Sequence, residues 1–285
     1  MRSHCLSPDN LVILRRRPGI RVRLPGTRDL RGIVDKNIHA TAIVEDGAEL
    51  GPGCVIEAYT IIKRHCILGA GVHVHPYCVI GGEPQDLHFD PSTPSGVRIG
   101  AGTVLREGVT ISRATKRGTC TTLGVRCFVM ASSHVAHDCQ LGDEVIMANA
   151  ALLGGHVSLG DRAFAGGGAV FHQFCRVGEN AMISGGSRLA QDVPPYVMAA
   201  ERNHIIGLNR VGLKRRGFAA ATVSELKRAY RAVYFEAGSP VRHAEQALAG
   251  GAFITPEAQR FLSFFAGGSK RGFARARGRA DTDET

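Results

Sequence analysis

A repeat of six residues constrains the fold of this chain more than any other feature. From Leu123 to Leu189, every sixth residue is large and apolar except Ala165, and the residue four positions further on carries a small side chain. Glycines follow the apolar position at intervals of three hexads, at Gly124, Gly142, Gly160 and Gly178. Six-residue repeats are typical of a parallel β-helix, in which each hexad forms one short strand and one corner. Three hexads close one triangular coil, so the sequence predicts a long, narrow prism.

The repeat begins earlier in the chain and is interrupted twice. Hexads run from Ile38 to Ile80, stop at residues 81–96, resume at Ile99 and pause again at residues 112–119. The first interruption is rich in proline and glycine, which predicts a loop that leaves the prism. Loops of this length on a regular scaffold usually carry function.

A helical region is expected after the repeat. Pro194 and Pro195 should end the strand ladder, because proline cannot donate a hydrogen bond to a neighbouring strand. Thr222 and Glu225 have the spacing of a capping box, which predicts the start of a helix. The apolar spacing predicts helices at residues 222–236, 240–249 and 256–265.

The chain therefore divides into four parts. Residues 1–33 form an Arg-rich extension and residues 269–285 a tail rich in Gly, Arg and Ala, and we expect both to be disordered. Residues 34–193 should form the β-helix and residues 194–268 a small helical domain. The expected fold class is mainly β: a parallel β-helix of hexapeptide repeats followed by a small C-terminal α-helical domain.

Charge, hydropathy and cysteine usage limit the possible partners and location. The net charge is +10, but residues 1–33 hold eight Arg and only two Asp, and no basic-aromatic motif accompanies them. We therefore expect no nucleic-acid partner. No apolar run reaches the roughly 18 residues that span a bilayer, so no integral membrane segment is expected. Most of the eight cysteines occupy small inward positions of the hexads, which predicts reduced core thiols and a cytoplasmic protein.

Histidines gather along one predicted edge of the prism. Residues three hexads apart should lie above one another, roughly 4.8 Å apart at the spacing of neighbouring strands. His137, Gly155 and Gln173 form such a stack. His156 and His172 are each one position away from it, and a further histidine, His134, precedes it on the same coil.

Several motifs resemble one family of enzymes. They are the segment IHATAIVEDGAELG from Ile38, GGEPQDL in the first loop, HVAHDC at 134–139, GGHV at 154–157, FHQFC at 171–175, QDVPPYV at 191–197 and GLKRRGF at 212–218. Together, over residues 34–273, the chain resembles the acyl-[acyl carrier protein]–UDP-N-acetylglucosamine O-acyltransferases of lipid A biosynthesis. The resemblance implies a left-handed parallel β-helix and a homotrimer with sites between subunits.

The resemblance also implies a reaction and its residues. A 3-hydroxyacyl chain would move from acyl carrier protein to the 3-hydroxyl of UDP-N-acetylglucosamine, without a cofactor or a metal. His137 would be the general base, Asp138 its charged neighbour, and the Gly155 N–H the donor to the oxyanion. The expected substrate contacts are His134, His156, His172, Gln173, Asn209, Arg215, Arg216 and His88.

Three other functions remain open at this point. His88, Ser112 and Val211 depart from the usual family pattern, so an amino-sugar acceptor acylated on nitrogen is possible. Histidines on adjacent coils could instead hold zinc, as in the γ-class carbonic anhydrases, although the acid after His137 and the C-terminal segment argue against this. A purely structural solenoid is the third alternative.

Overall fold

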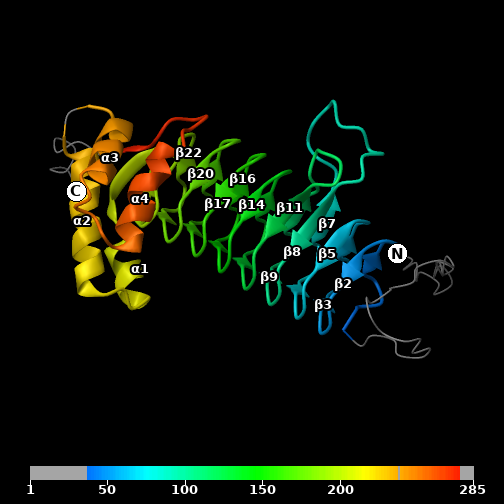
Figure 1. The fold of residues 1–285 in the computed structure, drawn as a ribbon. Coiled ribbons are helices and arrows are strands. Elements are labelled where there is room, and N and C mark those ends of the chain that lie inside the picture. The colour runs from blue at the N-terminus through cyan, green and yellow to red at the C-terminus, as the bar shows by residue number, and fades with distance from the viewer. Residues whose placement is uncertain (1–36, 237, 277–285) are drawn as a thin grey trace, which may run out of the picture.

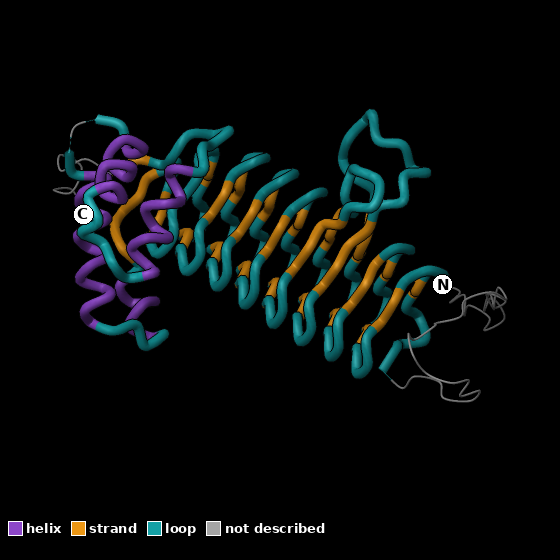
Figure 2. Tube along the Cα trace, viewed as in Figure 1, coloured by secondary structure: helices purple, strands orange, loops and turns teal. Residues whose placement is uncertain are grey.

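The computed structural model describes residues 37–236 and 238–276 and has the form of a prism with helices at one end (Figure 1). The predicted disordered extension, residues 1–33, lies outside the described residues. Three long sheets run along the prism (Figure 2), and up to β22 each successive strand of the chain adds to the next sheet in turn. The short strands and tight corners therefore repeat from coil to coil, as the hexads predict.

The strands of each sheet lie on successive coils. Sheet 1 consists of β1 (Ile43–Val44), β4 (Ile61–Ile62), β7 (Val79–Gly82), β10 (Thr110–Ser112), β13 (His134–Val135), β16 (Leu152–Leu153), β19 (Val170–Phe171) and β22 (Arg188–Leu189). Sheet 2 consists of β2 (Glu49–Leu50), β5 (Cys66–Leu68), β8 (Gly96–Ile99), β11 (Cys120–Leu123), β14 (Gln140–Leu141), β17 (Ser158–Leu159) and β20 (Arg176–Val177). Sheet 3 consists of β3 (Val55–Ile56), β6 (His73–Val74), β9 (Val104–Leu105), β12 (Phe128–Val129), β15 (Ile146–Met147), β18 (Phe164–Ala165), β21 (Met182–Ile183), β23 (Val197–Ala200), β24 (His204–Leu208) and β25 (Arg275–Ala276).

The core of the prism is built from the residues that the repeat selects. Ile62 and Leu105 are fully buried, and the small positions at Cys66 and Cys139 are buried beside them. Burial raises the pKa of each of these two thiols to about 12, so they act as small apolar groups. The seven cysteines of the described residues are all free, which confirms the prediction of reduced core thiols.

The corners have a conformation that favours particular residues. At most corners the second turn residue has a positive φ, including Asp138 (φ 59°), His156 (φ 60°) and Phe174 (φ 67°). This left-handed region is uncommon for residues other than glycine, with Asp, Asn and His enriched there. Because the three residues lie on successive coils, the same corner presents three outward side chains one above another.

The strand ladder continues beyond the two prolines, so the prediction that it ends there is wrong. β23 pairs in parallel with β21, and β24 returns antiparallel to β23. Proline at 194 and 195 is tolerated because both residues precede the paired segment, where no ladder hydrogen bond is needed. These strands extend sheet 3 beneath the helical region.

Four helices follow the last coil (Figure 1). They are α1 (Arg210–Arg215), α2 (Ala220–Tyr234), α3 (Pro240–Ala249) and α4 (Pro256–Ala266), of which the first was not predicted. The capping box at Thr222 is also wrong, because α2 begins earlier, with Ala219 as its N-cap. Glu225 instead accepts hydrogen bonds from the N–H groups of Ile254 and Thr255 at the start of α4 (2.8 and 2.9 Å). It thereby fastens α2 to α4.

The last described segment ties the helices to the prism. Arg176 donates to the fully buried carboxylate of Asp192 (Nε to Oδ2, 2.7 Å) and lies against the ring of Phe264 in α4. Phe273 packs against Phe265, and β25 pairs with β24. The expected disorder of residues 269–285 is therefore wrong for 269–276, while 277–285 lie outside the described residues. Residues 269–276 are ordered by the aromatic contacts of Phe273, which the Gly-rich and Arg-rich composition of this segment does not predict.

Replacement of Ile62 by Asp tests the inward register. The carboxylate would be buried without a partner, and we expect a loss of at least about 3 kcal/mol in the free energy of unfolding. Ile61→Asp is the matched control, because Ile61 lies on the same strand and is only half-buried. The control should lose about 1 kcal/mol or less. Denaturant unfolding measures both, and equal losses would contradict the register.

Candidate active site

The predicted base and its acid lie together at the corner between sheets 1 and 2. His137 and Asp138 are the two turn residues between β13 and β14. His137 Nδ1 lies 2.9 Å from Asp138 Oδ2, and both side chains are largely buried. A carboxylate only accepts hydrogen bonds, so the imidazole carries its proton on Nδ1. The lone pair is consequently on Nε2, which is the atom that can take a proton from a substrate.

Two threonines hold Asp138 in position. Thr115 donates its hydroxyl to Asp138 Oδ2 (2.7 Å) and its N–H to the same carboxylate (3.2 Å). The Asp138 N–H donates to the hydroxyl of Thr121 (2.8 Å). Burial alone would raise the pKa of Asp138, but the hydrogen bonds from His137 and Thr115 outweigh it and hold this pKa below its usual value. Asp138 is therefore a fixed anion beside His137.

Thr115 is a residue that the sequence analysis missed. It belongs to the segment at 112–119 where the hexads pause, which was noted only as an interruption. The pause was the available signal, because an insertion at one corner can reach the corner of the next coil. No feature of the sequence indicated that Thr115, rather than Ser112 or Lys116, makes the contact with Asp138.

Gly155 lies directly beside His137, as the repeat predicts. The register pairs β13 with β16, which brings the next corner level with the histidine. A Cβ at Gly155 would come within 2.5 Å of His137 Cε1 and 2.6 Å of Nε2, so no larger residue fits without displacing the ring. Within the described residues, the Gly155 N–H has no hydrogen-bond acceptor. A free donor and the predicted basic nitrogen thus lie side by side.

His156 completes a cluster of rings at this corner. Its ring packs edge-on against His137 (5.2 Å between centroids) and face-on against Phe174 (4.6 Å), whose other contact is the ammonium of Lys270 (4.7 Å). Burial lowers the pKa of His156, while the nearby carboxylate of Asp138 opposes this effect. His156 is therefore expected to act as a neutral hydrogen-bonding group at neutral pH.

Three other predicted residues lie on the same side of the prism. His134 shares a hydrogen bond with the hydroxyl of Thr110 (Nδ1 to Oγ1, 2.7 Å), and burial lowers its pKa. Its buried Nε2 finds no hydrogen-bond partner among the described residues. His172 and Gln173 are exposed one coil beyond Gly155 and His156, with His172 Nδ1 3.2 Å from the Gln173 carbonyl. These side chains are available to a bound molecule.

His137, Asp138 and His156 are also the residues that would hold zinc in the alternative function. Ligand atoms of His137, Asp138 and His156 lie within 4.8 Å of one another, so the donor set could hold a cation. Asp138 is, however, already the acceptor of three hydrogen bonds from His137 and Thr115, and His137 Nδ1 is one of the donors. The arrangement favours a base oriented by a carboxylate over a metal centre.

The loop at residues 83–95 carries His88 away from this cluster. His88 is exposed, and its N–H donates to Asp86 Oδ1 (2.9 Å). The loop is anchored by Arg113, a largely buried side chain that donates to the carbonyls of Thr93 (2.9 Å) and Pro91 (2.8 Å). Arg113 lies two residues before Thr115, so one short segment holds both the loop and the carboxylate of Asp138.

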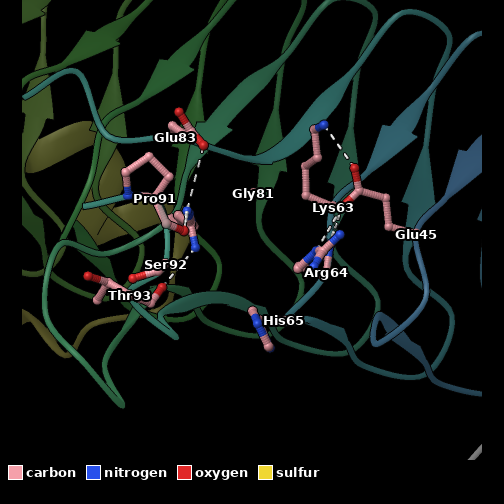
Figure 3. Close-up of a pocket in the computed structure, with 10 residues that line it drawn as sticks. Glu45, Lys63, Arg64, His65, Gly81, Glu83, Pro91, Ser92 and Thr93 are labelled. Carbon is pink, nitrogen blue, oxygen red and sulfur yellow. Dashed lines mark hydrogen bonds and ion pairs between the residues drawn. The ribbon is translucent and has the colours of Figure 1, made fainter. Parts of the chain in front are cut away.

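A pocket of about 380 Å³ lies at the base of this loop (Figure 3). Its basic groups already have acidic neighbours: Lys63 pairs with Glu45 (2.9 Å), and Glu83 lies 3.8 Å from Arg113. Gly81 forms part of its floor with φ at 83°, and a Cβ there would meet the Cys66 sulfur at 2.4 Å. None of the predicted site residues lines this pocket. We assign it a structural part in seating the loop.

Asn209, Arg215 and Arg216 lie in a different part of the molecule. Arg215 and Arg216 are exposed at the end of α1 and border a groove of about 560 Å³. The Asn209 side chain accepts from the Gly212 N–H (3.0 Å) and donates to the Asn180 carbonyl (3.0 Å), so it caps α1. The groove is also lined by Arg162, by Val211 and Gly212 of α1, and by apolar outward residues of sheet 3: Ile146, Phe164, Met182 and Met198.

The predicted site is therefore divided between two sides of the prism. The cluster of His137 lies at the corner between sheets 1 and 2, whereas the groove of Arg215 and Arg216 lies on the outer face of sheet 3. A corner of a triangular prism faces away from the sheet opposite to it. One copy of the chain does not bring the two sets of residues together, and the exposed His88 contacts neither of them.

Replacement of Thr115 by Val tests the support of Asp138. The valine keeps the shape but loses the hydroxyl donor, so the pKa of Asp138 should rise. A hydrogen bond to a charged group contributes about 1.5 kcal/mol or more, and this stability should be present near neutral pH and disappear as the pH falls through the pKa of Asp138. Carboxyl resonances in an NMR titration and unfolding at two pH values measure these effects.

The control for this variant is Thr119→Val in the same segment. Thr119 is exposed, and its hydroxyl donates to the carbonyl of Lys116 (2.7 Å). Its replacement should leave the titration of Asp138 unchanged. A Thr115→Val protein in which Asp138 titrates as before would show that the hydroxyl does not stabilise the carboxylate.

Two family models match parts of the chain. One is described as Udp N-acetylglucosamine O-acyltransferase, domain 2, and matches residues 192–274. The other is described as bacterial transferase hexapeptide (six repeats) and matches residues 47–82. The first contains α1 to α4, and the second lies within the first coils of the prism.

Whole proteins with the same combination are also similar. The acyl-[acyl-carrier-protein]–UDP-N-acetylglucosamine O-acyltransferase of Campylobacter concisus is 42% identical over 219 residues, which cover 70% of this chain and 83% of that protein. The enzyme of that name from Agrobacterium fabrum is 37% identical over 255 residues, covering 82% of this chain and 93% of that protein.

Solved structures agree with these relatives. The UDP-N-acetylglucosamine acyltransferase from Campylobacter jejuni superposes with a TM-score of 0.74 at 35% identity, covering 84% of this chain and all (100%) of that chain. The UDP-N-acetylglucosamine O-acyltransferase from Moraxella catarrhalis gives a TM-score of 0.77 at 30% identity, with coverage of 84% and 100%. The prism is accordingly the left-handed parallel β-helix that the resemblance implied. By its repeat, its C-terminal helices and its sequence, the chain belongs to the family of acyl-[acyl carrier protein]–UDP-N-acetylglucosamine O-acyltransferases.

Proposed function

We propose that this protein transfers a 3-hydroxyacyl chain from acyl carrier protein to the 3-hydroxyl of UDP-N-acetylglucosamine, the first step of lipid A biosynthesis. Family membership supports the reaction, and one observation supports the chemistry. A histidine oriented by a buried carboxylate lies beside a free backbone N–H at the same corner. Acyl transfer to a hydroxyl needs these two groups, a base and an oxyanion donor.

His137 removes the proton from the sugar hydroxyl as that oxygen attacks the thioester carbonyl. Nε2 is the receiving atom, since Nδ1 donates to Asp138. The positive charge that develops on the imidazole is stabilised by the neighbouring carboxylate, which the hydrogen bonds from Thr115 keep ionised. The Gly155 N–H donates to the oxyanion of the tetrahedral intermediate. His137 then returns its proton to the sulfur of the leaving thiol.

Four of the other predicted contacts surround this corner in the proposal, whereas Arg216 lies at the sheet 3 groove. His134 offers its unpartnered Nε2, and His156 offers a neutral ring. His172 and Gln173 are exposed two coils beyond His137 and can contact the nucleotide sugar. Arg216 lies near Glu144, whose pKa the hydrogen bonds from Arg126 and Arg162 lower to about 2.

We propose a homotrimer in which each site is shared by two copies. The His137 corner of one copy would face the sheet 3 groove of the next, so that Arg215 and Arg216 reach the diphosphate. His88 at the exposed loop would also approach a neighbouring copy. The division of the predicted residues between opposite sides of the prism supports this arrangement. The contact is heterologous, and such contacts close into rings.

A cytoplasmic location is part of the proposal. It is supported by the seven free cysteines of the described residues, since thiols stay reduced in the cytoplasm. In the described ranges, no helix is long and apolar enough to cross a membrane. Acyl carrier protein, the proposed donor, would reach the site from the same compartment.

Replacement of His137 by Ala tests the base. The turnover number should fall at least about 100-fold, with little change in the affinity for the nucleotide sugar. Asp138→Asn should lower the maximal rate as well, because the imidazolium that forms during attack loses its stabilising charge. His65→Ala is the control, since His65 is an exposed corner histidine far earlier in the prism. Near-normal turnover by His137→Ala would overturn the assignment.

Mixed oligomers test the shared site. His137→Ala and Arg216→Ala proteins should each be nearly inactive, but a refolded or co-expressed mixture should regain activity, because one copy supplies the histidine and its neighbour the arginine. With random mixing in equal amounts, about one quarter of the sites should carry both intact groups. Mixing His137→Ala with Asp138→Asn is the control and should restore nothing, since both groups belong to one corner. No recovery in the first mixture would argue for sites within single copies.

A further inference from the structure

Two histidines and a glutamate form a second cluster near the other end of the prism. His73 and His75 lie two residues apart, so both side chains point out of β6 and its continuation. Glu57 lies on the preceding coil, directly beneath His75. His73 Nε2 is 2.5 Å and His75 Nδ1 is 3.3 Å from the same oxygen, Glu57 Oε1.

The separation between His75 and Glu57 is the one expected between neighbouring ligand atoms of a metal site. Zinc lies about 2.0 to 2.2 Å from nitrogen and oxygen ligands, so neighbouring ligand atoms of a tetrahedron are roughly 3.3 to 3.6 Å apart. The separation of His75 Nδ1 from Glu57 Oε1 is 3.3 Å, and its separation from Glu107 Oε1 is 3.6 Å. The His73–Glu57 contact is shorter because it is a direct hydrogen bond, and a small rotation of the carboxylate would open it.

The surroundings suit an ion as well. The two imidazole rings are stacked with centroids 4.2 Å apart and planes inclined by 23°, and one nitrogen of each lies within 3.3 Å of Glu57 Oε1. The ligand atoms of Glu57, His73 and His75 all lie within 4.8 Å of one another. The side chains of His73 and Glu57 are 35% and 34% exposed, which leaves an entry path from solvent.

Glu107 and Arg106 define the outer boundary of the cluster. Arg106 donates to both oxygens of Glu107 (3.1 and 3.0 Å), so the charge of this glutamate is already balanced. Glu107 can therefore hold His75 or a metal-bound water, and Glu57 is left as the anionic ligand. Such a second carboxylate beyond the ligands is typical of zinc sites.

We propose that Glu57, His73 and His75 form a binding site for a divalent transition-metal ion of the zinc class, separate from the acyltransferase site. Two imidazoles and one carboxylate are the ligand set, and water fills the fourth position. The ion joins two successive coils, because Glu57 and the histidines belong to neighbouring turns of the prism. Its effect is to fasten the N-terminal coils against unfolding.

The alternative is that the three side chains form only a hydrogen-bonded ladder. Metal binding to the full-length protein distinguishes the two. After removal of metals with a chelator, Zn²⁺ alone is titrated in competition with a chromophoric indicator, and Co²⁺ is added separately to record the absorption of its tetrahedral complex. We expect one tightly bound ion for this cluster, a tetrahedral cobalt spectrum, and a higher melting temperature with zinc.

Variants assign the ion to these residues. Glu57→Gln, His73→Gln and His75→Asn should each weaken zinc binding on the order of 100-fold and remove the zinc-dependent rise in melting temperature. Melting in metal-free buffer verifies that each variant is folded. The control is His137→Ala combined with His156→Ala, which removes the other histidine cluster and should leave this ion bound. Zinc binding that is absent in the wild type, or unchanged in the His73→Gln, His75→Asn double variant, would overturn the proposal.

Discussion

The fold and the candidate site both depend on the parallel hydrogen-bond register between successive coils. Each strand pairs with the strand three positions later, so a residue keeps the same place on the prism from one coil to the next. This constraint brings Gly155 beside His137 and His75 above Glu57. It also keeps Ile62 inside. A shift of one residue in the register would turn every inward side chain outward. Burial of the core residues therefore sets the register, and the register determines which side chains meet at the corners.

The corners are the positions at which this regular scaffold can carry polar chemistry. Strand residues are divided between a packed interior and flat outer faces, whereas turn residues project from the edges. The positive φ at Asp138 turns its carboxylate back toward the preceding histidine, and an insertion supplies the donors that this carboxylate needs. The orientation of His137 therefore depends on the corner between sheets 1 and 2 and on the segment at 112–119, where the repeat is interrupted.

Much of this arrangement could be predicted from the sequence. The hexads predict the prism, the buried positions and the stacking of His137 with Gly155, because a strict period converts directly into distance. Contacts made by irregular segments could not be predicted in this way. Thr115, which donates to Asp138, lies in the segment where the hexads are interrupted. Glu225 accepts a hydrogen bond from the start of α4, 30 residues further along the chain. Phe273 is held by its contact with Phe265. The pairing of β24 with β25 likewise joins segments that share no periodicity.

The segment at 112–119 has a consequence for how this protein can vary. Arg113 donates hydrogen bonds to the carbonyls of Pro91 and Thr93 in the loop. Thr115 donates to the carboxylate of Asp138, which lies beside His137. Backbone carbonyls are present whatever the side chain, so these two hydrogen bonds do not depend on the side chains of Pro91 and Thr93. An evolving lineage could thus alter what the loop contacts while the spacing from Pro91 to Thr93 stays fixed. The anchor of the loop and the support of Asp138 are therefore only two residues apart in the chain.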